Sequence, residues 1–466
     1  MPIFFDNFYV RCQHTTITVA KEIWIIIDPI FSMRRNTLKQ ISGVRMSFDA
    51  LPIRPQRIAI IGGGISGLSA AYLMSPHHAV TLFDAAPQLG GHARTVMAGM
   101  NGDQPVDTGF IVFNYANYPH LTRMFQDLDV PVAKSNMSFG VSINDGEIEY
   151  GLRSLRSLMA QRRNLLRPGF TRMLRDIMRF NSKAEALTID DSTTIGEVMD
   201  DLKLGAWFQR FYLMPICGAI WSTPPAEIRR FPARTLIQFF SNHALLSRSG
   251  QHQWWTVDGG SIEYIRRLEH CLRGRGVAIR TGTPVKSVTR DGWQCFVHHA
   301  GASKAPFDQV IMACHSDQAL RLLANPTPQE HAVLSAIRFQ DNQMILHRDT
   351  SQMPRRKAAW SSWVYKADTS RPEPTIGVTY WMNRLQTLDP SYPLFLTLNP
   401  NIEPEASTLI REFEYTHPFF DQAALKSQQQ LWQLQGDRRT WFCGSYFGYG
   451  FHEDALQSGL AVAEQL

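Results

Sequence analysis

The stretch RIAIIGGGISGLSAAYL at residues 57–73 decides the fold of this chain. A short apolar run ends at Ile61, glycines follow, and apolar residues then recur at helical spacing. A second apolar run, AVTLFD at residues 79–84, reads as another strand. Strand, tight turn, helix and strand within 28 residues make a βαβ unit. The segment therefore predicts an α/β fold with a Rossmann-like domain.

The glycine spacing in this unit predicts a dinucleotide site. In Gly62-x-Gly64-x-x-Gly67, the first glycine permits the turn and the second lets a pyrophosphate approach the backbone. The third lets helix and strand pack closely, and the helix N-terminus offers N–H groups to the phosphates. Asp84 closes the next strand 22 positions after Gly62, where a carboxylate accepts hydrogen bonds from ribose hydroxyls. A glycine turn that serves packing alone does not explain Asp84.

Further stretches resemble a known family. LGGHART at residues 89–95 is similar to the second fingerprint of the flavoprotein superfamily of amine oxidases and phytoene desaturases. PVDTGFIVF (105–113), WTVDGGS (255–261), TPVKSV (283–288), VIMAC (310–314) and FCGSYFGYGFHEDALQSGLAVA (442–463) resemble later motifs of that family, in its order. NPNIEP, YTHPFFD and GFHEDALQSG are similar to a bacterial subgroup of FAD/NAD(P)-binding oxidoreductases whose substrate is unassigned.

The resemblance implies FAD as the cofactor, with a helix that begins at about Glu453 supplying backbone N–H groups to the flavin. The cofactor-binding residues that the motifs imply are Gly62, Gly64, Ile65, Ser66, Gly67, Asp84, Gly91, His92, Arg94, Thr108, Gly109, Val285, Ala313, Gly444, Ser445, His452, Glu453 and Ala455. Consecutive helical residues point about 100° apart, so His452, Glu453 and Asp454 cannot converge on one metal ion. We predict no metal site, and we expect Asp454 to point away from the flavin.

The predicted architecture has two domains. A Rossmann-like FAD-binding domain, assembled from residues 57–113, 256–325 and 436–466, is interleaved with a mixed α+β substrate domain from residues 114–255 and 326–435. Helical spacing predicts a helix at about 261–273, and alternating aromatic and polar residues predict antiparallel strands within 340–400. Residues 1–56 read as a disordered extension, or the start codon is set too far upstream and Met46 is the true start.

Three departures weaken the likeness to amine oxidases. FQDNQMILH at residues 339–347 lacks the lysine of that family, and Tyr446 stands where the family has a glutamate. Phe451 matches one position of the aromatic cage, and the other position is not placed. The candidate catalytic side chains are His92, His315, Tyr446 and Phe451, although His92 equally suits a role in holding FAD. Asp317 reads as a helix N-cap, and Trp254, Trp255, Trp360, Trp363, Tyr380 and Trp381 suggest either strand faces or an apolar pocket.

The sequence thus predicts an FAD-dependent oxidoreductase that moves a hydride from a C–N or C–C bond of an apolar, lipid-like substrate to flavin N5. Three alternatives stay open. They are a redox-neutral isomerase or mutase, a conventional amine oxidase, and a non-catalytic binding protein that has lost FAD. The electron acceptor is left open between O₂ and another molecule.

The composition of the chain limits which partners and which cellular compartment we expect. The net charge of +6 over 466 residues does not suggest nucleic acid, and six scattered cysteines without a C-x-x-C pair suit the reducing cytoplasm. No apolar run reaches the ~18 residues of a membrane span.

Residues 151–184 hold nine Lys/Arg and one acid, with a helical stripe of Phe170, Met173, Leu174, Ile177 and Met178. This basic segment is either a solvated face or a peripheral contact with an anionic membrane, which charge reversal at Arg162, Arg163 and Arg167 would distinguish.

Overall fold

The protein is described by a computed structural model. It covers residues 54–187, 190, 192–221, 228–242, 252–300, 305–368 and 377–466. The chain divides into two compact units, Met1–Arg54 and Pro55–Leu466, and the fold described is that of the second. The predicted N-terminal extension, residues 1–56, lies outside the described residues up to residue 53. Within the described ranges, no helix combines the length and the apolar character needed to cross a membrane.

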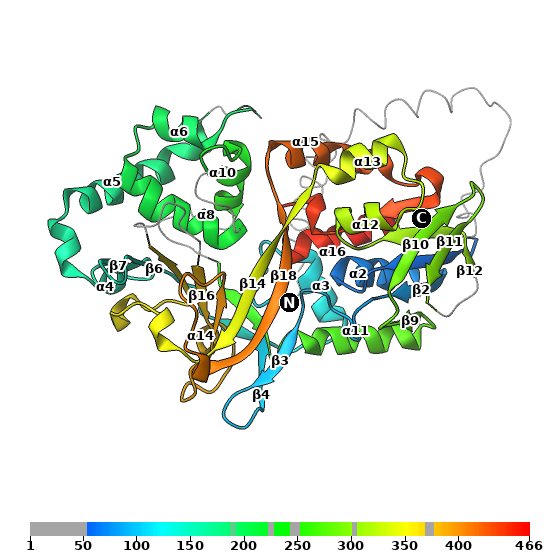
Figure 1. Cartoon of the computed structure of the whole chain (residues 1–466), viewed down its shortest axis with the longest axis horizontal. Helices are drawn as coiled ribbons and strands as arrows, with labels where there is room; N and C mark the ends of the chain where they lie inside the picture. The colour runs from blue at the N-terminus through cyan, green and yellow to red at the C-terminus, as the bar shows by residue number, and fades with distance from the viewer. Residues whose placement is uncertain are drawn as a thin grey trace, which may run out of the picture. The chain divides into compact units, whose positions relative to one another are not determined.

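A five-stranded parallel sheet carries the glycine-rich turn (Figure 1). Ile58 and Ile60 of its central strand face one core, whereas Ala59 and Ile61 face another. Because both faces are buried, the strand reads as a continuous apolar run and not as an alternation. In spatial order the strands are β19 (Thr440–Phe442), β13 (Gln309–Met312), β1 (Arg57–Ile61), β2 (Ala79–Phe83) and β9 (Ala278–Arg280).

Each face of this sheet is covered by a different layer (Figure 1). One core includes side chains of the helices α2 (Ile65–Met74), α3 (Pro119–Asp127), α11 (Ile262–Gly274) and α16 (His452–Ala463). The other core includes a small antiparallel sheet of β10 (Val285–Arg290), β11 (Cys295–His299) and β12 (Ala305–Phe307). The helices α12 (Ser316–Leu322), α13 (Pro328–Ser335) and α15 (Gln422–Leu431) join this second core.

A seven-stranded sheet with a helical cap forms the other half of the unit (Figure 1). Its strands are β18 (Leu409–Phe419), β14 (Arg338–His347), β17 (Phe395–Leu398), β16 (Gly377–Trp381), β15 (Trp363–Ala367), β6 (Phe139–Ile143) and β7 (Ile148–Gly151). The cap consists of α4 (Leu155–Leu158), η1 (Arg162–Leu166), α5 (Pro168–Lys183), α6 (Ile195–Asp201), α7 (Ala206–Phe208), the π-helical turn η3 (Gln209–Leu213), α8 (Met214–Trp221) and α10 (Ala233–Asn242). Two antiparallel pairs complete the strands: the hairpin of β3 (Thr95–Ala98) with β4 (Gln104–Asp107), and β5 (Val132–Ser135) with β8 (Trp254–Val257), which are distant in sequence.

The strands of the two main sheets come from different segments of the chain. All five parallel strands lie in residues 57–113, 256–325 and 436–466, and all seven strands of the larger sheet lie in the remaining segments. However, α3, α13 and α15, which lie in the segments predicted for the substrate domain, pack into the cores of the parallel sheet. The predicted helix at 261–273 is α11, and the strands predicted within 340–400 are β14 to β17.

The predicted apolar stripe of the basic segment is wrong at one position. Phe170 and Met173 of α5 are buried, but Met178 is 47% exposed. Phe180 is buried instead. Residues 170, 173 and 180 keep the spacing of one helical face, whereas 178 lies off it.

The packing of α16 on α2 depends on Gly459. A side chain at this position would collide with the carbonyl oxygen of Ser66 and the hydroxyl of Ser69. We therefore expect Gly459→Ala to lower the free energy of unfolding by about 1–3 kcal/mol, as overpacking does. The control is Gly274→Ala at the exposed end of α11, where a Cβ meets no atom within 4 Å. That variant should be unchanged or slightly more stable. Urea unfolding of the purified proteins measures both, and equal losses would contradict the expectation.

Candidate functional site

The turn between β1 and α2 uses its three motif glycines for different reasons. Gly62 has φ +116°, and a Cβ there would collide with the backbone of Ala313. A Cβ on Gly67 would collide with the carbonyl oxygen of Gly62. Gly64, the N-cap of α2, lines a large cavity, and a Cβ there would meet no protein atom within 4 Å. The protein itself thus requires the first and third glycines, while the second leaves room for a ligand at a helix N-terminus.

Asp84 lies beside this turn, directly after β2. Its Oδ2 accepts a hydrogen bond from the backbone N–H of Gly63 at 2.6 Å, and its Oδ1 accepts one from the N–H of Ala86 at 2.7 Å. A carboxylate has about four lone-pair sites, so these two bonds orient it without saturating it. It lines the cavity together with Thr283 and Val285. This arrangement suits recognition of a ribose.

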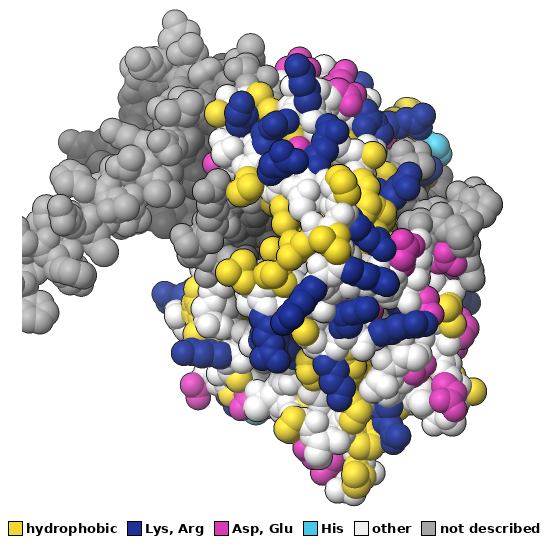
Figure 2. All heavy atoms as spheres, turned by 90° about the vertical axis from the view of Figure 1, so that its left-hand side faces the viewer, with side chains coloured by type: hydrophobic (Ala, Val, Ile, Leu, Met, Phe, Trp, Pro, Cys, Tyr) yellow, Lys and Arg dark blue, Asp and Glu magenta, His cyan; other side chains and the backbone are white. Residues whose placement is uncertain are grey.

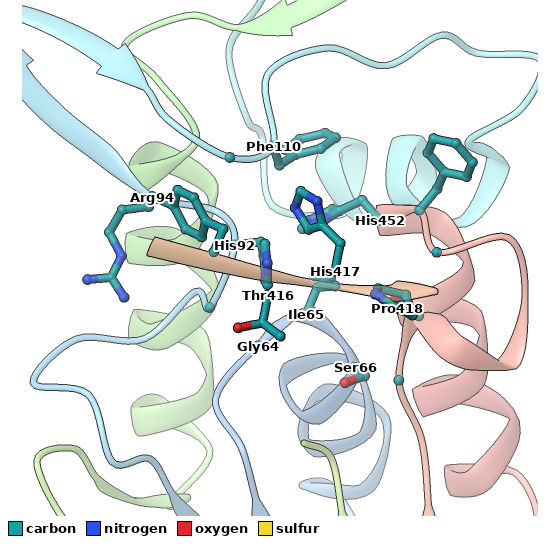
Figure 3. A pocket seen from close by; sticks show the side chains of 18 of the residues that line it. Gly64, Ile65, Ser66, His92, Arg94, Phe110, Thr416, His417, Pro418 and His452 are labelled. Carbon is teal, nitrogen blue, oxygen red and sulfur yellow. The ribbon is translucent and has the colours of Figure 1, made fainter. Parts of the chain in front are cut away.

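The GGHART loop crosses the start of α2. The backbone N–H of Gly90 donates to the carbonyl oxygen of Gly63 at 2.8 Å, and Gly90 and Gly91 have φ of +114° and +57°. The left-handed backbone at both glycines turns the loop so that His92 and Arg94 line the cavity (Figure 3). Arg94 therefore brings a positive charge to the same cavity as the α2 N-terminus, where anionic phosphates are stabilised.

Helix α16 starts at the cavity and sends its first two side chains in different directions. The ring of His452 stacks on Phe110, with centroids 4.0 Å apart, and its Nε2 lies 2.7 Å from the hydroxyl of Tyr264. Burial lowers the pKa of His452 to about 3, so this ring is neutral at physiological pH. Glu453 accepts hydrogen bonds at 2.8 and 3.0 Å from two backbone N–H groups at the start of α3. The backbone at the start of α16 faces the cavity, while the Glu453 side chain faces α3.

Asp454 turns back onto its own loop. Its Oδ2 accepts hydrogen bonds from the backbone N–H groups of Tyr449 at 3.0 Å and Phe451 at 2.8 Å. A side chain on Gly448 would collide with this carboxyl, which explains the glycine. Asp454 is not among the residues that line the cavity, as the sequence led us to expect. In the described part of the chain, no group of His, Cys, Asp and Glu residues is arranged to hold a metal ion.

Three histidines from distant segments, His92, His315 and His417, meet in the cavity wall, and Figure 3 shows His92 and His417. The ring of His92 lies 6.0 Å from that of His315 and 5.6 Å from that of His417, centroid to centroid. Burial, reinforced by the neighbouring histidines, lowers the pKa of His92 to about 3. Burial likewise lowers the pKa of His417 to about 4 and the pKa of His315 below its ordinary value. The cluster is therefore uncharged at neutral pH and offers polar contacts without a positive charge.

Most of the predicted site residues line this single cavity of about 980 Å³. Those that do are Gly62, Gly64, Ile65, Ser66, Asp84, Gly91, His92, Arg94, Gly109, Val285, Ala313, His315, Gly444, Ser445, Tyr446, Phe451, His452 and Ala455. Gly67, Thr108 and Glu453 do not line it. Thr108 lies behind the wall, where its hydroxyl is 2.8 Å from that of Tyr415.

One smaller prediction is corrected, and one open alternative is decided. Asp317 is not the N-cap of α12, because it lies in the first turn and pairs with Arg321 at 2.8 Å, while His315 holds the N-cap position. Of the six aromatic residues left open between core and pocket, Trp254, Trp363 and Tyr380 line the cavity and the others do not.

Sequence reasoning missed the strand β18 as part of the site. Its residues Glu414–Pro418 line the cavity, and Tyr415 and His417 contact the ring of His92. In the sequence, the stretch YTHPFFD indicates only a likeness to a subgroup. A histidine and a threonine between aromatics in a strand are a weak signal, because the same pattern fits any half-exposed strand.

The residues present fit FAD. Gly64 leaves a cradle that a Cβ would fill, Asp84 suits a ribose, and Arg94 and the α2 N-terminus suit a pyrophosphate. The buried Nε2 of His92 has no hydrogen-bond partner among the described residues, so a polar ligand group can satisfy it. The volume lies at the upper end of ligand sites, which span about 300–1,000 Å³.

Comparison with known proteins agrees with this geometry. The sequence model of the family described as flavin containing amine oxidoreductase matches residues 65–343. No curated protein sequence matches the chain.

Three solved structures share the fold. A fatty acid isomerase from P. acnes that produces CLA is 14% identical, with a TM-score of 0.62 over 91% of this chain and 100% of that chain. Cyclohexylamine oxidase from Brevibacterium oxydans IH-35A is 14% identical, with a TM-score of 0.63 over 88% of this chain and 99% of that chain. Reduced UDP-galactopyranose mutase is 14% identical, with a TM-score of 0.61 over 88% of this chain and 95% of that chain. At such identities the likeness establishes the fold alone.

Gly64 offers a direct test of the cofactor site. Because its Cβ would meet no protein atom, we expect Gly64→Ala to fold with unchanged stability of the FAD-free protein. The added methyl group occupies the space of the pyrophosphate, so FAD affinity should fall by at least about tenfold. Titration of the FAD-free protein by flavin fluorescence measures the affinity, and urea unfolding checks the fold. Unchanged FAD affinity would show that the cofactor does not approach this turn.

Asp454 should make stability depend on pH. Burial raises the pKa of its carboxyl from 3.8 to about 6, although the two N–H bonds oppose the shift. A carboxyl with a raised pKa in the folded state stabilises the fold at low pH, and this contribution is lost as the pH rises from about 3.8 to about 6.

Asp454→Asn keeps an oxygen that accepts both hydrogen bonds but removes the titration. Between about pH 5 and about pH 7.5, the variant should gain about 1 kcal/mol of stability relative to the wild type. Urea unfolding of both proteins at the two pH values measures the change. A difference between them that does not vary with pH would contradict this assignment.

Proposed function

The chain belongs to the flavin containing amine oxidoreductase family, and we propose that it oxidises an apolar, lipid-like substrate at a C–C or C–N bond. FAD, when bound, supplies the hydride acceptor at flavin N5. The substrate side of the cavity supports this choice of substrate.

The end of the cavity beside the seven-stranded sheet is apolar. Its lining residues belong to, or pack against, the core of that sheet and its helical cap. They are Met137, Phe139, Tyr212, Ile216, Phe239, Met344, Trp363, Tyr380 and Phe451. We call these residues the apolar end. Burial of an aliphatic substrate against them contributes about 0.8 kcal/mol for each CH₂ group removed from water. Their rings also exclude water from the neighbouring part of the cavity.

The apolar end lacks the features that favour a protonated amine. Among the described lining residues the carboxylates are Asp84, which lies beside the phosphate turn, and Glu414, which is exposed. No lysine lines the described cavity. Phe451, which matches one cage position of the amine oxidases, stacks on Phe239 with ring centroids 5.1 Å apart and an angle of 17°. One face of Phe451 is therefore covered by another ring instead of facing a cationic group. An uncharged reacting group fits this end better than an ammonium ion, whose burial without a partner is costly.

The side chains around the cavity supply position and a neutral polar wall. The backbone N–H groups at the start of α16 offer a positive helix end to the cavity, which favours negative charge there. His92, His315 and His417 stay uncharged at neutral pH, so they can donate or accept hydrogen bonds without adding a cation. Tyr446 is buried, and its hydroxyl has no hydrogen-bond partner in the described part of the chain.

A redox-neutral reaction is the second candidate. Proteins that share this fold include a fatty acid isomerase and a sugar-nucleotide mutase beside oxidases. The neutral wall and apolar end would serve an isomerisation of an unsaturated chain as well as an oxidation. The two differ in whether an electron acceptor is consumed.

Anaerobic photometry tests the proposal. The purified protein with FAD is mixed without oxygen with small amines, with unsaturated fatty acids and with carotenoid-like polyenes. We expect an apolar, unsaturated compound to bleach the flavin absorbance and small amines to leave it unchanged. Bleaching by amines alone would overturn the proposal. Conversion of a fatty acid without any loss of acceptor would identify the isomerase instead.

Met344 provides the matched variants for this experiment. It is buried and lines the apolar end. Met344→Glu introduces a carboxylate there and should lower kcat/KM for the bleaching compound by at least about tenfold, because a buried charge without a partner is unfavourable. Met344→Leu conserves volume and polarity and should stay within about threefold. Equal activity of both variants would show that the substrate does not occupy this end.

A further inference from the structure

The helical cap exposes leucines among arginines on one face. The residues concerned lie in residues 152–167, which include α4 and η1, and we call them the α4–η1 face. They are Leu152, Arg153, Leu155, Arg156, Met159, Arg162, Arg163, Leu165, Leu166 and Arg167. Leu155 is 76% exposed and Leu166 is 84% exposed. Figure 2 views the molecule from this side and shows Lys, Arg and hydrophobic side chains gathered together, with fewer acidic ones.

The positive charge of this face is not neutralised by its own segment. Asp176 is the one acid in residues 151–184, and it is buried, where it accepts a hydrogen bond from the backbone N–H of Gly205 at 2.8 Å. Arg167 pairs with Glu147 at 3.2 Å. For Arg156 and Arg162, no ion pair is found among the described residues. These two exposed guanidinium groups are free to meet an anionic partner.

The exposed leucines indicate what kind of partner this is. Scattered exposed apolar residues are ordinary on protein surfaces. Here four exposed leucines and an exposed methionine stand among five arginines within the 16 residues 152–167. A nucleic acid would use the arginines but not the leucines, because its phosphates dominate the contact. A bilayer with anionic headgroups uses both, since arginines bind phosphates while apolar side chains enter the boundary of the acyl chains.

The α4–η1 face also meets the cavity. Leu152 and Arg153 line the cavity and are exposed at the surface. They follow β7 directly and begin the segment that carries the arginines. One continuous stretch of chain therefore contributes to the cavity wall and to the basic, leucine-bearing surface. A molecule held in a bilayer under this face would lie beside the lining residues of the cavity.

We propose that the α4–η1 face docks this protein on the surface of an anionic lipid bilayer. The arginines bind lipid phosphates, and Leu155 and Leu166 enter the headgroup region. The docking itself does not require the substrate to be a lipid. Its test is therefore independent of the test of the proposed function.

Co-sedimentation with vesicles tests the proposal. The FAD-loaded full chain is mixed with vesicles of phosphatidylcholine alone and with vesicles that contain about one third phosphatidylglycerol, over a range of salt. We expect binding to the anionic vesicles that weakens as salt rises, and weak binding to the neutral ones. Absence of binding to anionic vesicles at low salt overturns the proposal. Equal binding to both kinds of vesicle overturns the role of the arginines.

Two double variants separate the electrostatic and apolar contributions. Arg156→Glu with Arg162→Glu, and Leu155→Ser with Leu166→Ser, should each weaken binding by at least about tenfold. We choose Arg156 and Arg162 over Arg163, because Arg163 donates to the carbonyl oxygen of Glu147 and its loss can disturb the fold. Flavin absorbance and urea unfolding confirm that each variant is folded.

Matched controls change the same charge and apolarity elsewhere. Lys286→Glu with Lys426→Glu alters exposed cations on β10 and α15, both of which lie away from α4 in Figure 1. Met100→Ser with Trp293→Ser removes side chains that are 73% and 80% exposed. Both controls should bind within about twofold of the wild type. If the controls lose as much binding to anionic vesicles as the α4–η1 variants do, the α4–η1 face is not the docking surface. If duplex DNA binds and the vesicles do not, the partner is a nucleic acid and the proposal fails.

Discussion

Contact of backbone against backbone at the start of α2 is the constraint on which the rest of this structure depends. Gly62 lies against the backbone of Ala313, Gly67 against Gly62, and Gly459 of α16 against Ser66. No side chain fits at any of these three positions. The approach holds the N-terminus of α2 at the carboxyl ends of the parallel strands, where loops from several segments converge. Asp84 and the GGHART loop are both hydrogen-bonded to Gly63 in that turn.

Helix α16 connects this phosphate end to the substrate end. Its first three residues form separate contacts, to Tyr264, to the start of α3 and to the preceding loop. The loop before it places Phe451 in the apolar end. Strand β18 makes a similar connection, because Tyr415 meets Thr108 behind the GGHART loop and His417 meets His92. The polar wall between the two ends is thus built from residues more than 300 positions apart in the chain.

The chemistry of this family member resides in the side chains around a shared scaffold. Oxidases, an isomerase and a mutase share the fold, so the fold does not choose the reaction. Three features of this chain bear on its reaction: an apolar end that has no lysine among the described residues, a neutral cluster of histidines, and an adjoining surface of arginines and leucines. The first two features support the proposed oxidation of an apolar substrate, and the third supports the proposed docking on a bilayer.

Local patterns in the sequence determined the βαβ unit, the glycine turn and the start of α16 to within a residue, since turn geometry and helix period depend on neighbours in the chain. The sequence also pointed to Asp84, from its position after the second strand, and to Arg94, from the family resemblance, and both residues line the cavity. Other features depended on tertiary structure. The packing of helices and strands against one another decided three of them. These are the burial of Phe180 in place of Met178, the position of His315 as N-cap, and the contribution of β18 to the cavity wall. The sequence could not show that His417 would lie beside His92, because long-range pairing of β14 with β18 decides it. The lowered pKa values of that cluster likewise arise from burial, a property that neighbouring residues in a chain do not encode.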